Sequence, residues 1–186
     1  NRSEAVGFDP AYTGGPVALG GRLRFVADFY GPGVAVPADA VVCRHVIEHL
    51  PDPVGLLRTV CAAAGGSGVY FETPCAEWIL RNRVPWDFFY EHCSLFTARS
   101  LAVAFDRAGL GAPSVRHVFG GQYLWAECGS HRAGEAPPGD PAEVVRLAHA
   151  FAEDEREKFA GWDALFQDLR GRGPVFAWGA GAKGVT

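Results

Sequence analysis

Apolar residues in the first half of the chain form short runs, and each run gives way to acidic or polar residues. This pattern is typical of strands in a parallel sheet, which are covered on both faces and carry ligand-binding groups where they end. Two of the runs end near Asp9 and Asp28, and a third is followed by closely spaced arginine, histidine and glutamate side chains. The runs that predict strands are residues 4–9, 23–29, 39–43 and 68–72.

Helices are predicted where apolar residues recur at helical spacing between capping residues. Residues 53–64 follow Asp52, a good N-cap, and precede Gly65, which favours a helix end. Further helices are predicted at residues 76–82, at 98–108 and at 140–170, the last ended by Gly171.

The order of these elements predicts the fold class. Strand, helix and strand alternate with short connections, so we expect an α/β protein with a doubly wound, mostly parallel sheet. Residues 114–119 and 122–128 flank two glycines and predict an antiparallel hairpin at the end of that sheet. The Pro- and Gly-rich residues 131–139 are typical of a linker. Residues 175–178 are predicted to be a strand that runs into a glycine-rich turn at 179–184.

Composition narrows the functional classes. The formal net charge is −4 and Lys and Arg do not cluster, which argues against a nucleic-acid partner because phosphate binding needs a concentrated basic patch. Apolar runs are too short to span a bilayer and the chain opens without a signal segment, so we predict a cytoplasmic protein with no membrane partner. The five cysteines include no CxxC pair, so they are predicted to be reduced thiols, and no metal site is predicted.

The acids that end the first two strands suit a nucleoside ligand. Asp9 could accept hydrogen bonds from both ribose hydroxyls, and Asp28 from an adenine amino group with Phe29 against the ring. An acid at a strand end is also a common turn former. Each of these residues therefore has a structural interpretation beside the functional one.

The order of these motifs resembles class I S-adenosylmethionine-dependent methyltransferases over residues 4–128. The most specific part is His-Val-Ile-Glu-His-Leu at 45–50, supported by Gly-Phe-Asp at 7–9, Ala-Asp-Phe at 27–29 and Phe-Glu-Thr-Pro at 71–74. The resemblance implies S-adenosylmethionine as cofactor, and a Rossmann-like core whose first strand and glycine-rich loop would precede this chain. The residues predicted to bind the cofactor are Asp9, Asp28, Phe29, Arg44 and His45.

The segment Tyr90, Glu91 and His92 is similar to bacterial sugar C-methyltransferases, which act on nucleotide-linked keto-deoxysugars. The resemblance implies that His92 removes a proton alpha to a ketone and that the resulting enolate attacks the methyl group. Imidazole suits this role because its pKa lies near neutrality. Glu91 would orient His92, and Tyr90 would donate to the enolate oxygen. The family pattern has a tyrosine two residues before the glutamate, where this chain has Phe89.

The same resemblance extends to the substrate and to the domain organisation. Gln122 and Tyr123 are predicted to contact a small-molecule substrate of the nucleotide-sugar class. Residues 1–130 are predicted to be the methyltransferase core, truncated at its N-terminal side, and 131–139 the linker. Residues 140–186 are predicted to be a long helix and the first strand and glycine turn of a second Rossmann-like domain.

Other interpretations stay open at this point. An O- or N-methyltransferase would use the same cofactor, with His92 taking a proton from a heteroatom. A non-catalytic nucleotide-binding fragment is a second alternative, and a nicotinamide oxidoreductase, based on residues 179–184 alone, is a third. Tyr90, Glu91 and His92 could also form a purely structural buried network.

Overall fold

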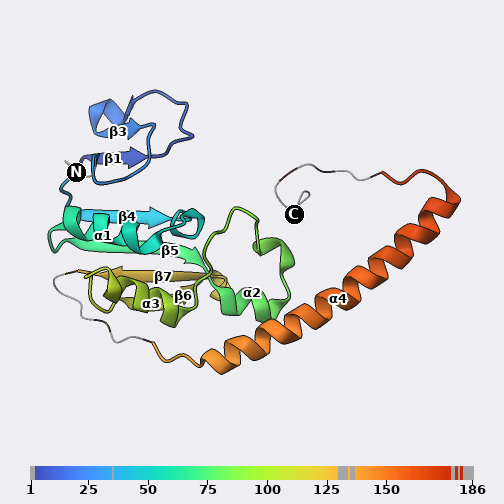
Figure 1. Ribbon diagram of the computed structural model, residues 1–186. Coiled ribbons are helices and arrows are strands. Elements are labelled where there is room, and N and C mark those ends of the chain that lie inside the picture. The colour runs from blue at the N-terminus through green and yellow to red at the C-terminus, as the bar shows by residue number, and fades with distance from the viewer. Residues whose placement is uncertain are drawn as a thin grey trace.

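A computed structural model describes residues 3–34, 36–129, 134, 137–176, 179 and 181, and these form an α/β fold. The strands lie in two sheets, of order β1-β3-β2 and β4-β5-β7-β6 (Figure 1). The strands are β1 (Ala5–Phe8), β2 (Val17–Ala18), β3 (Leu23–Val26), β4 (Ala40–Arg44), β5 (Gly68–Pro74), β6 (Ser114–Val118) and β7 (Tyr123–Cys128). The helices are α1 (Pro53–Ala64), α2 (Ala76–Asn82), α3 (Ala98–Arg107) and α4 (Pro141–Arg172).

The larger sheet confirms the predicted strand directions. β4 pairs in parallel with β5, whereas β7 is antiparallel to both β5 and β6. The turn between β6 and β7 places Gly120 at φ 66° and Gly121 at φ 98°, a backbone region that glycine adopts without a Cβ clash. The predicted hairpin therefore forms around its two glycines.

The predicted single, doubly wound sheet is not formed by the described strands. β1 pairs in parallel with β3, but it shares no sheet with β4, which is an edge strand of the larger sheet. On β4, Val41 and Cys43 pack against the core, while Val42 is 60% exposed. The apolar run at 39–43 predicted a strand covered on both faces, but among the described elements only the α1 side is covered.

The core lies between the four-stranded sheet and helices α1 and α3, which cross the same face of it (Figure 1). Leu57 of α1, Phe71 of β5 and Phe105 of α3 are fully buried, and the two phenylalanine rings meet edge to face at 5.3 Å. Burying a side chain of this size contributes about 2 kcal/mol. This packing fixes the carboxyl ends of β4 and β5 in space.

Helix α1 begins and ends where the capping residues predicted. The Asp52 carboxylate accepts a hydrogen bond from the backbone N–H of Gly55 at 2.8 Å, and Gly65 ends the helix in the left-handed conformation at φ 55°. For α3, Thr97 and Ser100 form a reciprocal capping box. These local signals explain why both helices match the prediction.

Helix α4 extends away from the sheet (Figure 1). Its first half contacts the α2 region, where the ring of Phe151 meets that of Phe88 at 5.2 Å. The predicted end at Gly171 is wrong by two residues, because Arg172 continues the helix and pairs with Asp168 one turn earlier at 2.7 Å. None of the described helices has the length and apolar character needed to cross a bilayer.

Only part of the predicted C-terminal strand falls within the described residues, and that part does not form a strand. Val175 and Phe176 lie outside any strand. The rest of that prediction lies outside the described residues, except for Gly179 and Gly181 in the glycine-rich turn. Most of the predicted linker at 131–139 also lies outside the described part of the chain.

Candidate functional site

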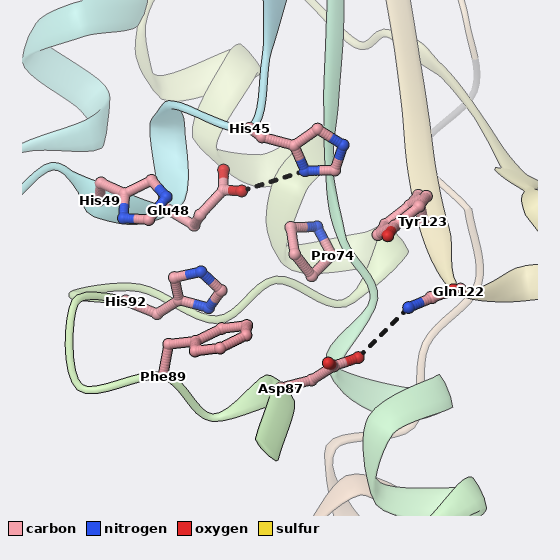
Figure 2. Close-up of a pocket in the computed structure, with 9 residues that line it drawn as sticks. All are labelled: His45, Glu48, His49, Pro74, Asp87, Phe89, His92, Gln122 and Tyr123. Atoms are coloured by element: carbon pink, nitrogen blue, oxygen red, sulfur yellow. Dashed lines mark hydrogen bonds and ion pairs between the residues drawn. The ribbon is translucent and has the colours of Figure 1, made fainter. Parts of the chain in front are cut away.

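A pocket opens where β4 and β5 end and β7 begins. Its cavity has a volume of about 120 Å³. The pocket draws on segments far apart in the chain, which places it at the carboxyl edge of the parallel strand pair, where α/β proteins bind ligands. The residues that line it, drawn in Figure 2, are His45, Glu48, His49, Pro74, Asp87, Phe89, His92, Gln122 and Tyr123.

The chain turns sharply into the pocket after β4. His45 has a positive φ of 53°, which is unusual for a residue with a Cβ, and its backbone N–H donates to the carbonyl of Glu72 at 2.9 Å. Its ring Nε2 lies 3.0 Å from Glu72 Oε1, and its Nδ1 lies 3.5 Å from Glu48 Oε1. The ring meets Tyr123 edge to face at 4.8 Å. His45 therefore forms part of the pocket wall, held between two acids.

Buried acids surround the pocket. Glu48, Glu72 and Asp87 are all buried, the first with only 2% of its surface exposed. Glu72 accepts hydrogen bonds from the Arg44 guanidinium at 2.8 and 3.0 Å, so this arginine is committed to a protein carboxylate. Burial, followed by the charge of Asp87, raises the pKa of Tyr123 above its ordinary value. Tyr123 therefore keeps its phenolic proton at neutral pH.

His92 lies between His49 and Phe89, with ring centroids 4.8 and 5.1 Å away (Figure 2). Its Nδ1 is buried and has no hydrogen-bond partner among the described residues. Burial lowers the pKa of His92 below its ordinary value, and the charge of Glu48 opposes that shift. His92 is therefore a neutral imidazole at neutral pH, in the form that accepts a proton.

The two residues before His92 do not enter the pocket. The backbone N–H of His92 donates to the carbonyl of Phe89 at 3.0 Å, which closes a turn with Tyr90 and Glu91 at its corner. Tyr90 is 79% exposed and Glu91 is also exposed. A hydrogen bond with Glu91 raises the pKa of Tyr90, so these two side chains interact with each other. The structure thus brings His92 into the site without its two predicted helpers.

Both residues predicted to contact the substrate line the pocket. Tyr123 and Gln122 stand at the start of β7, and Gln122 Nε2 donates to Asp87 Oδ2 at 3.4 Å (Figure 2). Neither Asp87 nor a chemical role for Glu48 was predicted from the sequence. The available signal was an acid inside the aromatic stretch 86–90 and another between two histidines.

The residues predicted to bind the cofactor divide into two groups. Asp9 and Asp28 follow adjacent parallel strands, so they lie at the same edge of the small sheet. Each uses Oδ1 in a local bond, Asp9 with the N–H of Ala11 at 2.8 Å and Asp28 with that of Phe29 at 2.7 Å. The Phe29 ring is 67% exposed beside them. Arg44 and His45 belong instead to the pocket network around Glu72.

The pocket also contains side chains of the types that bind metal ions. One oxygen of Glu48 and one ring nitrogen each of His49 and His92 lie within 4.8 Å of one another. Cys75, Glu77 and His117 form a second such group elsewhere. Carboxylate and imidazole are common ligands of zinc and of other transition metals.

Comparison with known proteins gives one match over much of the chain. Residues 3–112 match the model of a family described as a methyltransferase domain. This match covers more than half of the 186 residues. A search among curated proteins gave no match.

Solved structures give more distant similarities. One is a provisionally assigned O-methyltransferase from Nostoc punctiforme PCC 73102, with 17% identity over 58% of this chain and 37% of that chain, and a TM-score of 0.43. Another is an O-methyltransferase from neocarzinostatin biosynthesis, solved with S-adenosylmethionine and 2-hydroxy-5-methyl naphthoic acid, with 21% identity over 58% of this chain and 33% of that chain, and a TM-score of 0.45. The matched part of the chain covers only about a third of the length of either protein.

Proposed function

Because the chain belongs to the methyltransferase domain family, whose methyl donor is S-adenosylmethionine, we propose that it forms part of an enzyme that methylates carbon in a nucleotide-linked keto-sugar. The family membership confirms the enzyme class and the cofactor that the sequence predicted. The methylation of carbon and the sugar substrate are inferred from the residues that line the pocket.

The acids of the small sheet fit the nucleoside part of the cofactor. Asp9 and Asp28 each have one carboxylate oxygen engaged locally, so the other can accept from ribose hydroxyls or from an adenine amino group. The exposed ring of Phe29 offers a flat apolar surface for the base. When bound, S-adenosylmethionine supplies an electrophilic methyl group.

The observation that carries the proposed reaction is the position of His92. Its neutral ring projects into a pocket that also holds a phenol and buried acids. Methylation of carbon needs a base that creates the nucleophile, and a buried imidazole that is neutral at pH 7 can take the proton alpha to a ketone. The electron pair of the broken C–H bond would delocalise onto the ketone oxygen and then form the new bond to the methyl carbon, while the bond from that carbon to the sulfonium sulfur breaks and S-adenosylhomocysteine leaves.

The enolate oxygen needs a hydrogen-bond donor while its charge develops. Tyr90 was predicted for this role, but its ring is largely exposed at the corner of a turn. Tyr123 lines the pocket, and its raised pKa keeps its O–H group intact. We therefore assign the donation to Tyr123, with Gln122 and Asp87 available for neighbouring substrate hydroxyls.

Solvent exchange tests the base without requiring methyl transfer. The enzyme, extended at both ends by its encoded neighbouring residues, is incubated in heavy water with a nucleotide-linked keto-deoxysugar, and proton NMR follows deuterium uptake alpha to the ketone. We expect His92→Ala to reduce uptake and methyl transfer by about 10²- to 10⁴-fold. His149→Ala, at an exposed position on α4, is the matched control. Full C-methylation by His92→Ala would exclude His92 as the base.

The same assay separates the two candidate tyrosines and the acceptor atom. Tyr123→Phe is expected to lower kcat at least 10-fold, as is usual for loss of a donor to an oxyanion, and Tyr90→Phe much less. Carbon NMR of the product places the new methyl group. A methyl carbon bonded to oxygen would instead support the O-methyltransferase alternative, in which His92 deprotonates a hydroxyl.

A further inference from the structure

Glu48 is the most deeply buried acid of the pocket, and its carboxylate is only partly satisfied. Oε2 accepts a hydrogen bond from Thr73 Oγ1 at 3.0 Å. Oε1 is buried and accepts no hydrogen bond from the described residues, its ion-pair neighbour being His45 Nδ1 at 3.5 Å. Leaving a carboxylate oxygen in this state is costly, so a functional reason is expected.

A second unsatisfied atom lies on the same side of the pocket. The Nδ1 of His92 is buried without a partner, and one ring nitrogen of His92 lies within 4.8 Å of a Glu48 oxygen. No direct hydrogen bond joins the two side chains among the described residues, but groups this close and this buried interact strongly through charge. The spacing also allows one hydroxyl, from water or substrate, to bridge them.

We propose that Glu48, rather than Glu91, is the positioning residue for His92, orienting its ring through a bridging hydroxyl and stabilising by its charge the imidazolium formed when His92 takes a proton. This inference rests on the proposed role of His92 as the base. Glu91 is exposed at the corner of its turn, where water screens its charge, whereas Glu48 is shielded from solvent. A buried carboxylate beside a catalytic imidazole acts in the same way in other enzymes that transfer protons.

The proton balance is simple. His92 takes the proton from the substrate carbon and becomes positively charged beside the negative Glu48. Glu48 takes no proton in this step and accepts a hydrogen bond from the Thr73 hydroxyl. After methyl transfer, His92 releases the proton to solvent and returns to its neutral form. Glu48 thus lowers the cost of the charged state without bonding to the substrate carbon.

Histidine titration tests the pairing without any substrate. The ring of His92 is followed by NMR against pH in the purified chain and assigned by its loss in His92→Gln. We expect Glu48→Gln to lower the pKa of His92, because the negative charge that favours the imidazolium is gone. Glu91→Gln tests the original assignment and should shift that pKa less. Glu48→Asp keeps the negative charge but moves it away from His92. The pKa of His92 in this variant should lie between those of wild type and Glu48→Gln. It replaces Glu48→Gln in the test if the glutamine variant folds poorly.

Kinetics on the extended enzyme, with S-adenosylmethionine and a nucleotide-linked keto-deoxysugar, provides the second measurement. Glu48→Gln should lower kcat by roughly 10- to 100-fold with little change in KM, and should move the acid limb of the kcat profile to lower pH. Glu157→Gln, exposed on α4, is the matched control. A merely structural Glu48 would leave the position of that acid limb unchanged.

Three outcomes are distinguishable. If Glu48→Gln leaves the titration of His92 unchanged, or Glu91→Gln shifts it more, the inference is wrong. If one equivalent of zinc binds wild type and is lost in His49→Ala, the group is a metal site and the inference is also wrong. If Glu48→Gln shifts the pKa of His92 while methyl transfer is unaffected, the pairing stands and the proposed base is refuted.

Discussion

Replacing Thr73 with valine is expected to destabilise the protein by about 2 kcal/mol, through its effect on Glu48. Thr73 is fully buried at 0% exposure, and its hydroxyl gives the carboxylate its only hydrogen bond from the described residues. Valine keeps the branched shape but cannot donate. The substitution therefore leaves a buried charge without a donor while changing little else.

The magnitude follows from the kind of bond removed. A hydrogen bond to a charged group contributes about 1.5–3 kcal/mol. Part of that loss is recovered if water enters the pocket and solvates the carboxylate, which places the expected cost near the middle of the range. Since unfolding in urea has a slope of about 1–3 kcal/mol per molar, the urea midpoint should fall by roughly 1 M.

Thr59→Val is the matched control, because the Thr59 hydroxyl donates only to the backbone carbonyl of Gly55 in the same helix, at 3.1 Å. Thr59→Val should change the free energy of unfolding, obtained from its urea midpoint, by less than about 0.5 kcal/mol. In a Glu48→Gln background the cost of Thr73→Val should shrink, because a neutral amide is less costly to leave unpaired. Equal midpoints for the two valine variants would refute the dependence of Glu48 on Thr73.

Two further predictions concern the ligand and pH. Asp9→Asn and Phe29→Ala should each weaken the binding of S-adenosylhomocysteine to the extended enzyme about 10-fold, as measured by calorimetry. The control is Asp106→Asn, at an exposed position. Unchanged affinity in the first two variants would remove Asp9 and Phe29 from the cofactor site. The folded-state pKa of His92 lies below its unfolded value of about 6.5, so the unfolded chain takes up the proton first as the pH falls. Stability should therefore decline below about pH 6.5, and less steeply in His92→Gln than in the control variant His149→Gln, whose site is exposed on α4. Urea midpoints that fall equally in both variants between about pH 7.5 and pH 5.5 would contradict this sign.

Local signals in the sequence identified the helices well. Asp52 and Gly65 bound α1 because capping is decided within a few residues of the helix end. At Gly171 the same reasoning failed, because α4 continues across this glycine to Arg172, which pairs with Asp168 one turn earlier. The division of the strands into two sheets depends on pairing between segments far apart in the chain. The sequence of residues 39–43 does not indicate which strand lies beside them.

The site was predictable only in part, for a related reason. The chemistry of His92 could be expected from its residue type, but the sequence does not say which side chains of an irregular segment face inward. The bond that closes the turn from Phe89 to His92 decides this, turning those two residues into the pocket and leaving Tyr90 outside. The role of Glu48 depends on its distance from His92, which lies far along the chain.

The pocket holds a base and a donor whose pKa values are moved in opposite directions. Burial lowers the pKa of His92, so the imidazole is neutral, and burial together with the surrounding acids raises the pKa of Tyr123, so the phenol keeps its proton. Pairs of titratable groups separated in this way mark acid and base roles in many enzymes. Enolate chemistry requires a neutral His92 and a protonated Tyr123. Both forms are present together over a pH range wider than the interval between the ordinary pKa values of histidine and tyrosine, about 6.5 and 10. The buried acids act on the two groups differently: they raise the pKa of Tyr123 further, whereas the charge of Glu48 partly offsets the lowering of the His92 pKa by burial.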